Sequence, residues 1–439
     1  METLKDISPL KSKSMLLTLK AIVAFVLILI LMIPMAFIHE LLVERQLRQE
    51  EVRREVSQKW AGAQRLTGPI LILPYRGEPV KDQNGNITGY ETARLFILPD
   101  SLNIQGSITP HLRHRSIFDV TVYQADLQVS GHFNLPDLAK IPLDAFFPEE
   151  ACIFFGLDDF RGLETQLKIQ WGEACLEFAA DAPPTGFREN GLYAPLRLPL
   201  SALLQPRDFN MNLSIKGSES LMFTPLGKTN HTEIQSTWDK PSFDGHFLPN
   251  PQAQISEEGF EAQWNVLYLN RNYPQVWKNQ SYNLDSSRYG VNLLQAVDSY
   301  AKTLRAQKYA LLFIALSFAL YFFLEILQKR KIHPVQYVLV GTALCVFYVL
   351  LLSLSEYLSF NLSYVLAALA TVALISLYTL SAFRSGKIAL LFGAVLSSLY
   401  GFIFILIQLE DKALLFGSLG LFAILAVVMY GSRKIEWYG

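Results

Sequence analysis

One acidic residue is the first candidate for a chemical role in this sequence. Glu325 lies within the apolar run 309–327, where an ionisable side chain is a functional candidate by default because its burial is costly. The simplest interpretation is an ion pair with Lys329, one helical turn later and in the favourable Glu-to-Lys order. Alternatively, the acid shares a proton or a ligand with polar residues that follow it, namely His333, Gln336 and Tyr337.

His333 precedes Pro334 at the start of the next apolar run. Proline costs little in the first helical turn, where its missing N–H would have no partner, so a plain helix start explains the pair. Imidazole also titrates near neutral pH, and on that alternative interpretation His333 makes the hinge sensitive to pH.

Polar residues also close that apolar run. Ser353, Ser355 and Glu356 follow its last leucines. They mark either the point where a helix end meets water or a polar contact with a soluble domain, through residues such as Arg305 or Lys308.

A short acidic and basic cluster lies in the middle of the chain. Asp158, Asp159 and Arg161 are near neighbours, and a carboxylate with a guanidinium at this spacing commonly holds a turn. A recognition site is the alternative.

Cysteine and histidine spacing predicts neither a metal site nor a catalytic site. Cys152 and Cys175 either pair as a disulfide or are two separate strand thiols. His111 and His114 are spaced like metal ligands, but the flanking arginines would repel a cation. A phosphate-binding loop with Lys-Ser/Thr and a nucleophile elbow are both absent from the sequence. We therefore expect no catalytic residue, no cofactor and no metal.

Composition indicates a chain divided between membrane and water. The 439 residues are 51% hydrophobic and 18% charged, which is too apolar for an ordinary soluble protein and too polar for one buried in a bilayer throughout. The formal net charge of −1 gives no general attraction for nucleic acid, so a nucleic-acid partner is not expected.

Six apolar runs are each long enough to cross a membrane, since about 20 helical residues span the hydrocarbon core. The run 21–38 continues into His39 and Glu40 without a small-residue cleavage site, which favours an uncleaved first helix over a signal peptide. The predicted transmembrane helices are residues 21–38, 309–327, 337–354, 362–383, 388–409 and 413–430. The other predicted parts are an N-terminal segment over 1–20, an amphipathic stalk helix over 39–60, a β-rich domain over 61–308 and a tail over 431–439.

The β-rich domain is predicted from period-two alternation of apolar and polar residues. Phe209–Ile215 and Phe260–Tyr268 alternate in this way, and Asn84-Gly85 forms a hairpin turn between Ile70–Tyr75 and Ala93–Leu98. Leu102–Ile108 and Leu167–Trp171 repeat the pattern. The predicted fold class is a membrane α plus β protein, with a large antiparallel β-sandwich-like domain, or two packed sheet units, inserted between transmembrane helices 1 and 2.

Basic residues in short loops predict the orientation. Alternate ends of the C-terminal helices carry residues 329–331, then Arg384 and Lys387, then Arg433 and Lys434, while the opposite loops hold Lys412. Both termini are therefore expected in the cytoplasm and the β domain outside, which in a bacterium is the periplasm. Basic residues near the β domain argue the other way, but a large domain weakens the bias.

Several motifs then resemble one family. They are Tyr289-Gly290-Val291, Lys308-Tyr309, Arg330–Tyr337, Leu352–Glu356, Leu98–Leu102 and Asp159–Gly162. Together they resemble the inner-membrane protein CreD family, over nearly the whole chain. The resemblance implies a cell-envelope integrity protein of Gram-negative bacteria, associated with a two-component sensor system and with tolerance to agents acting on the envelope, without an established enzymatic activity.

The leading hypothesis is therefore a non-enzymatic inner-membrane protein that supports or monitors the envelope through its periplasmic domain. Its expected partners are the lipid bilayer and a periplasmic or envelope protein or ligand. The alternative is a transporter or permease of a small or lipidic molecule through the C-terminal helices. An enzyme acting on envelope polymers ranks third, because no clustered carboxylates or Ser/His pair stand out in the predicted sheets.

Overall fold

The computed structural model describes residues 9–84, 86–134, 145–180, 190–203, 205–279, 282–293, 299–328, 332–409 and 412–433. The chain divides into two compact units, a β unit over residues 51–296 and a helical unit over residues 1–50 and 297–439. The long first helix, α1 (Pro9–Trp60), contributes to both units.

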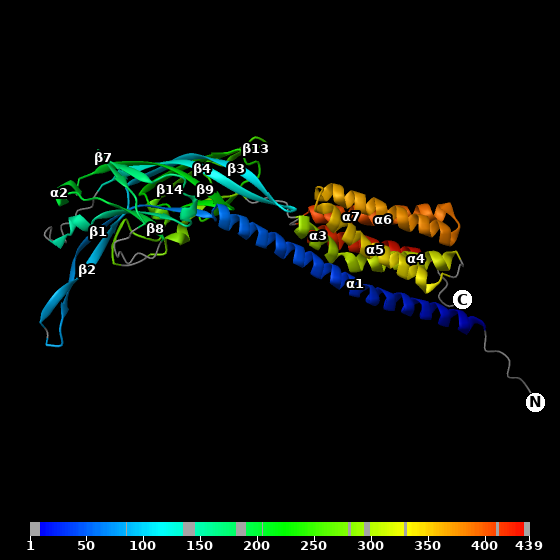
Figure 1. The fold of residues 1–439 in the computed structure, drawn as a ribbon. Helices are drawn as coiled ribbons and strands as arrows, with labels where there is room; N and C mark the ends of the chain where they lie inside the picture. Colours follow the sequence, from blue (N-terminus) through cyan, green and yellow to red (C-terminus); the bar gives the residue numbers. More distant parts are fainter. Residues whose placement is uncertain are drawn as a thin grey trace, which may run out of the picture. The chain divides into compact units, whose positions relative to one another are not determined.

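Two eight-stranded sheets build the β unit (Figure 1). The first sheet, sheet A, has the strand order β12-β16-β10-β1-β2-β15, and β5 joins β8 to the other edge of β1. Its strands are β1 (Gln64–Lys81), β2 (Ile87–Ile97), β5 (Cys152–Leu157), β8 (Gly191–Pro195), β10 (Ser220–Phe223), β12 (Ser242–Gly245), β15 (Val276–Lys278) and β16 (Tyr289–Asn292).

The second sheet, sheet B, has the order β13-β14-β11-β3-β4-β9-β6-β7. Its strands are β3 (Ser101–Arg115), β4 (Phe118–Phe133), β6 (Lys168–Trp171), β7 (Ala174–Glu177), β9 (Arg207–Ser218), β11 (Thr229–Ser236), β13 (Gln254–Ser256) and β14 (Gly259–Leu267). Short helical turns connect the strands: η2 (Pro148–Glu150), η3 (Phe160–Gly162), α2 (Leu200–Leu203), η4 (Tyr268–Asn270) and η5 (Leu284–Ser287).

The strands predicted by alternation are present. In β9, Phe209, Met211, Leu213 and Ile215 are buried and the intervening residues face outward. The predicted hairpin forms between β1 and β2, with Leu71 opposite Ile97; Gly85 of its turn lies outside the described residues. The hairpin extends well beyond the predicted strands and projects from the body of the unit (Figure 1).

The prediction of an antiparallel domain is wrong in one respect, because the sheets are mixed. β1 pairs with β10 in parallel, and β3 pairs with β11 in parallel, with Ser101 opposite Thr229. Each parallel pair joins strands that are far apart in the sequence, so local alternation carries no signal of it. The inner faces of both sheets share one core, which includes Trp171, Trp264, Tyr123 and Tyr289.

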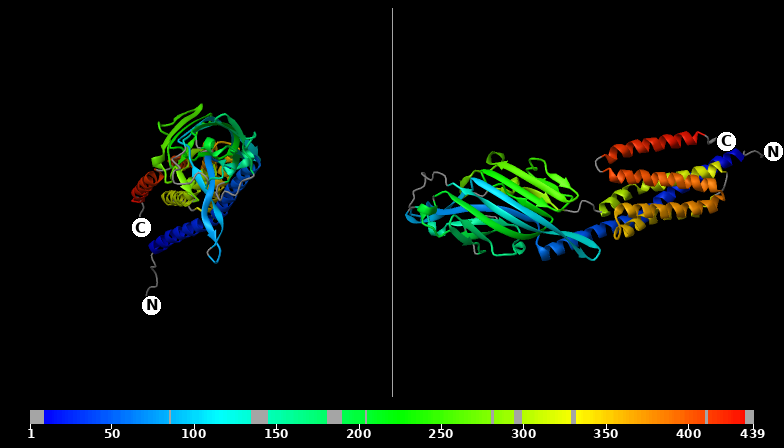
Figure 2. Two further views of the ribbon diagram at one scale, coloured as in Figure 1. Left: turned by 90° about the vertical axis from the view of Figure 1, so that its left-hand side faces the viewer. Right: turned by 90° about the horizontal axis from the view of Figure 1, so that it is seen from above.

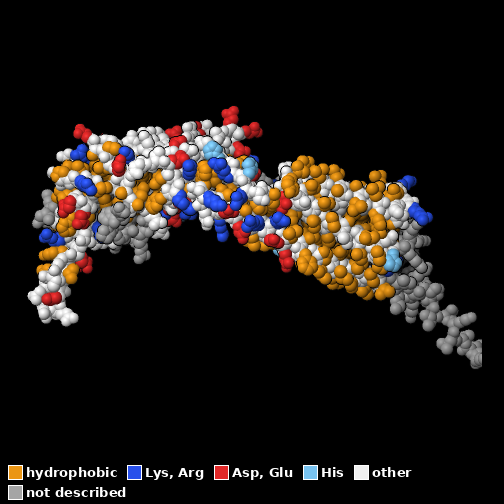
Figure 3. Space-filling view, viewed as in Figure 1, with side chains coloured by type: hydrophobic (Ala, Val, Ile, Leu, Met, Phe, Trp, Pro, Cys, Tyr) orange, Lys and Arg blue, Asp and Glu red, His pale blue; other side chains and the backbone are white. Residues whose placement is uncertain are grey.

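The helical unit contains the first part of α1 and six further helices. These are α3 (Ser299–Lys308), α4 (Ala310–Leu327), α5 (Pro334–Ser355), α6 (Phe360–Phe383), α7 (Gly386–Gln408) and α8 (Ala413–Ser432). In this unit α5 packs against α6, and α6 packs against α7 (Figure 2). Apolar side chains cover most of the visible face of these helices (Figure 3), as expected for helices surrounded by lipid.

One predicted boundary needs correction, and one predicted apolar stripe is only partly buried. Residues 299–308 lie in the predicted β-rich range, yet they form α3, because Tyr300, Thr303, Ala306 and Gln307 recur at helical spacing and bury one face. The predicted stalk helix is the continuation of α1, but its expected apolar stripe is only partly buried. Leu47 is 61% exposed, whereas Val52 is buried.

Among the described residues, four helices are long and apolar enough to cross a membrane: α1 from Leu19 onward, α5, α6 and α7. The pair α3 and α4, bent by 44° at Tyr309, makes a fifth span if it crosses as one unit. In α8 the residues Ala413–Ala426 form a shorter apolar helix. The structure therefore has four to five such spans where the sequence predicts six.

Candidate functional site

Glu325 lies at the centre of a buried polar cluster in the helical unit. Its side chain is 4% exposed, near the end of α4. One carboxylate oxygen accepts hydrogen bonds from the ammonium of Lys20 in α1 and from the backbone N–H of Ile332, the latter at 3.0 Å. The other accepts a hydrogen bond from the hydroxyl of Tyr337 in α5, also at 3.0 Å. The acid thus connects three segments of the chain.

Each of the two sequence interpretations of Glu325 captures part of this cluster. The acid forms an ion pair with Lys20 of α1; Lys329, the partner predicted from the sequence, lies outside the described residues. Tyr337, one of the three polar residues predicted to share a proton or ligand with the acid, donates a hydrogen bond to it. His333 instead caps α5, its Nδ1 accepting a hydrogen bond from the N–H of Val335 at 3.3 Å. Gln336 is half-buried, and its N–H donates to the carbonyl of His333.

Lys20 is positioned by a stripe on α1 that the sequence analysis did not identify. Leu31, Met35, Ile38 and Leu42 are buried at spacings of three and four residues, which places them on one helix face. Leu31 approaches Gly341 of α5 so closely that a Cβ at that glycine would lie 2.2 Å from Leu31 Cδ1. Small residues allow such close contact between helices in membranes.

A second polar contact joins α1 to α3. The amide of Gln307 donates a hydrogen bond to the carbonyl of Met35 at 2.8 Å, and its oxygen lies 3.0 Å from Nδ1 of His39. Because that oxygen can only accept, Nδ1 of His39 must carry the proton. The buried side chain of Gln307 therefore fixes both the position of α1 and the tautomer of His39.

A third contact lies at the end of α5. The carboxylate of Glu356 is 3.8 Å from Nε of Arg45 in α1 and accepts a hydrogen bond from the hydroxyl of Tyr300 in α3 at 3.5 Å. Ser355 donates to the carbonyl of Leu352 in its own helix. Arg305 and Lys308, the residues named for a contact with a soluble domain, belong to α3 in the helical unit, and that contact stays a prediction.

In the β unit, Asp159 and Arg161 hold a turn. Asp159 accepts hydrogen bonds from the N–H of Gly62 at 2.8 Å and from the backbone and guanidinium of Arg161. Arg161 in turn donates to the carbonyl of Gln58 near the end of α1. Hydrogen bonding to Arg161 is the main reason why the pKa of Asp159 falls from 3.8 to about 2. The cluster therefore fastens the end of α1, and the residues between α1 and β1, to the turn that follows β5.

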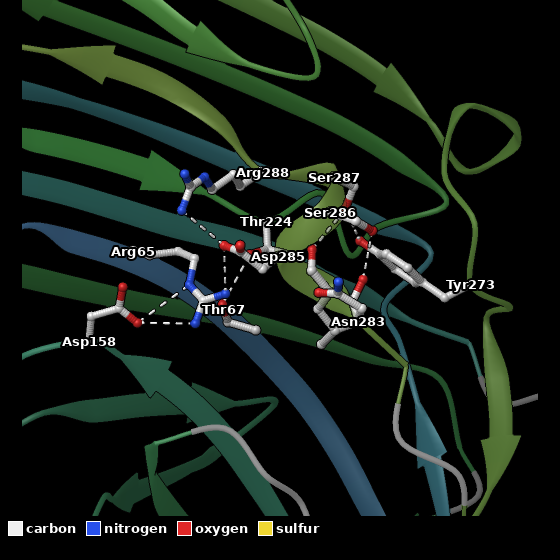
Figure 4. A network of polar contacts seen from close by, with 11 residues as sticks. Arg65, Thr67, Asp158, Thr224, Tyr273, Asn283, Asp285, Ser286, Ser287 and Arg288 are labelled. Carbon is white, nitrogen blue, oxygen red and sulfur yellow. Dashed lines mark hydrogen bonds and ion pairs between the residues drawn. The ribbon is translucent and has the colours of Figure 1, made fainter.

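A charged network begins at the neighbouring residue, Asp158 (Figure 4). The guanidinium of Arg65 contacts Asp158 at 3.1 Å and Asp285 at 3.0 Å, and Arg288 contacts Asp285 at 3.2 Å. The hydroxyls of Thr67 and Thr224 meet at 3.0 Å beside it. These contacts connect β1 with the ends of β5 and η5, so Asp158 also has a partner that holds the fold.

The outward face of sheet B carries a hollowed polar surface. Two adjoining hollows of about 590 Å³ and 580 Å³ share Ser107 and Gln235. The lining side chains that point outward are amides, hydroxyls and carboxylates, as in Gln105, Asp126, Gln128, Asn212, Ser214, Glu233 and Glu261. Ser214 donates to Asp126 at 2.6 Å. This face can exchange many hydrogen bonds with a polar ligand or partner.

The cysteines are separate thiols. Cys152 is buried in β5 of sheet A, and Cys175 is exposed in β7 of sheet B. Burial raises the pKa of the Cys152 thiol to about 12, so that thiol is unreactive. His114 pairs with Asp119, and within the described ranges no three His, Cys, Asp or Glu side chains are arranged to hold a metal ion.

These features define a multi-pass membrane protein that carries a large domain of mixed β-sheets. The family model described as "Inner membrane protein CreD" matches residues 16–438, and the chain belongs to this family. A curated relative, the inner membrane protein CreD of Escherichia coli (strain K12), is 29% identical over 415 residues, which cover 94% of this chain and 91% of the relative. The resemblance predicted from the motifs is confirmed, and the chain is a multi-pass protein of the inner membrane.

Proposed function

We propose that this protein is a non-enzymatic inner-membrane protein that supports or monitors the cell envelope through its β unit, which lies in the periplasm. The chain crosses the membrane six times in this proposal, with α8 as the last span and both termini in the cytoplasm. Its partners are the lipid bilayer and an envelope protein or ligand, and nucleic acid is not among them.

The observation that carries the proposal is the hollowed polar face of sheet B. Its outward side chains present amide, hydroxyl and carboxylate groups over two adjoining hollows that no other part of the β unit covers among the described residues. The acids singled out elsewhere each connect two segments of the fold: Asp159, Glu325 and Glu356 all have structural partners. A binding role for the face therefore fits the described contacts better than acid–base chemistry.

Complementation tests the proposal. A strain lacking the gene would be challenged with detergent and with inhibitors of cell-wall synthesis, then supplied with the wild type, a variant lacking residues 68–283, or the charge-reversal variant Asp126→Lys/Glu233→Lys. We expect the wild type to restore survival and the other two to fail, because reversed charges remove acceptors from the centre of the face.

The matched control is Glu78→Lys/Glu91→Lys on the projecting β1–β2 hairpin, where both side chains are exposed. It makes the same charge change away from the face and should restore survival. Equal amounts of each variant in the membrane would be confirmed by immunoblotting. Full restoration of survival by Asp126→Lys/Glu233→Lys would show that this face of sheet B is not needed for the function.

A transporter or permease is the second candidate. Buried hydroxyls without a hydrogen-bond partner among the described residues favour it, because such groups are costly between helices: Ser317 and Ser363. If Glu325→Gln fails to restore survival while present at normal levels, the transporter becomes the better supported function. If it restores survival and the variant lacking residues 68–283 does not, the β unit carries the function.

A further inference from the structure

An apolar slot adjoins the ion pair of Glu325 and has no assigned role. Its volume is about 230 Å³, and the first turn of α5 and one face of α1 form its walls. Lys20, Glu325 and Tyr337 form its polar end. The apolar lining consists of Leu19, Val23, Ala24, Leu27, Ile332 and Pro334. A narrow apolar space with one polar end matches a hydrocarbon chain that carries a polar headgroup.

At the polar end of the slot, the group available to a ligand is the positively charged Lys20 and not the negatively charged Glu325. Both oxygens of Glu325 already accept hydrogen bonds, from Lys20, Ile332 and Tyr337. The ammonium of Lys20 has three N–H donors, of which one points to Glu325, and its side chain is still 35% exposed. A headgroup at this position therefore meets N–H donors with positive charge, which favours phosphate oxygens.

We propose that this slot binds an anionic phospholipid, with one acyl chain between α1 and α5 and the phosphate on the ammonium of Lys20. The source is the bilayer that surrounds the helices, where juxtamembrane basic residues attract anionic lipids. The lipid would fill the space beside the junction of α1, α4 and α5 that the ion pair holds together. This inference does not depend on the function proposed for the β unit.

Native mass spectrometry of the full-length protein tests the proposal. Detergent-solubilised protein would be mixed with equal amounts of phosphatidylglycerol and phosphatidylcholine that carry identical acyl chains. We expect the wild type to retain phosphatidylglycerol over phosphatidylcholine by about fivefold, the effect of one lysine near an anionic headgroup. Glu325→Gln keeps Lys20 and removes the carboxylate that opposes its charge, so it should keep or strengthen this preference.

Two variants separate the headgroup from the chain. Lys20→Met/Glu325→Gln removes both charges together, so that neither is left buried without a partner, and it should lower the preference to about one. Ala24→Phe fills the slot and should reduce retention of both lipids. Val26→Phe, on the exposed face of the same helix, is its matched control and should behave as the wild type does.

Three results would overturn the proposal: equal retention of the two lipids by the wild type, an unchanged preference in Lys20→Met/Glu325→Gln, or equal lipid retention by Ala24→Phe and Val26→Phe. Thermal unfolding of each variant in the same detergent shows whether a loss of bound lipid comes from the changed slot or from a less stable protein. If Ala24→Phe unfolds early, the headgroup preference of the better-folded charge variants decides the outcome.

Discussion

Asp159 gains its low pKa from groups that exist together only in the folded β unit. The guanidinium of Arg161 contributes most, and the N–H of Gly62 adds to it. The folded protein therefore binds the proton of Asp159 more weakly than the unfolded chain does, and this difference stabilises the fold wherever the carboxylate is charged. The sequence analysis identified the turn correctly, but it could not foresee that the turn fastens the end of α1.

Replacing Asp159 with Asn should destabilise the β unit at neutral pH by about 1 kcal/mol, allowing for the solvent that reaches Arg161. The carboxylate contributes fully above its unfolded pKa of 3.8, and this contribution is lost as the pH falls toward about 2. The difference between Asp159→Asn and the wild type should therefore shrink over that interval and vanish below it.

Urea unfolding followed by tryptophan fluorescence measures this difference. The signal reports the β unit because five of the six tryptophans lie in its sequence range: Trp60, Trp171, Trp238, Trp264 and Trp277. Glu258→Gln, an exposed acid in the same unit, is the control and should change the midpoint little. A destabilisation by Asp159→Asn that stays constant down to pH 2 would contradict the assigned cause.

At the scale of elements, the contact between α1 and α5 depends on one glycine. Gly341 faces Leu31, and any Cβ there would require Leu31 to move. Larger side chains at closely packed positions cost about 1–3 kcal/mol because neighbours leave their preferred rotamers. This glycine therefore sets how closely the first helix can approach the later ones.

Gly341→Val should lower the thermal stability of the helical unit, and Leu31→Ala should restore part of the loss when the two are combined. Stability can be measured as the midpoint of thermal unfolding in detergent. Gly401→Val in α7 is the matched control, since open space surrounds a Cβ at that position. If Gly341→Val and Gly401→Val lower the midpoint equally, or if Leu31→Ala only adds to the loss, the two helices do not pack as described.

Local sequence patterns predict individual helices and strands better than they predict which of these elements pair or pack together. Apolar runs identified α4 to α7, and period-two alternation identified strands such as β9 and β14. Each of these elements could be predicted because its own residues carry the whole pattern. The partners of Glu325 could not be predicted, since Lys20 is 305 residues away in sequence. The helical spacing of Tyr300, Thr303 and Gln307 was available and would have identified α3. The parallel pairs of β1 with β10 and β3 with β11 had no local signal.

At the scale of the whole molecule, the orientation in the membrane determines what the β unit can meet. The basic residues of short loops predict that this unit faces the periplasm. One natural residue can report on it directly, because Cys175 is exposed in β7 while Cys152 and Cys345 are buried. The deep burial of Cys152, which raises its pKa to about 12, keeps it from competing for a thiol reagent.

A membrane-impermeant maleimide added to spheroplasts should therefore label the wild type at one site. Cys175→Ser should remove the label, and Cys152→Ser should leave it unchanged. Labelling that appears only after the cells are lysed would place the β unit in the cytoplasm and would refute the proposed contact with the periplasm. The same result would leave the fold and the lipid slot intact, since neither depends on which side of the membrane the β unit occupies.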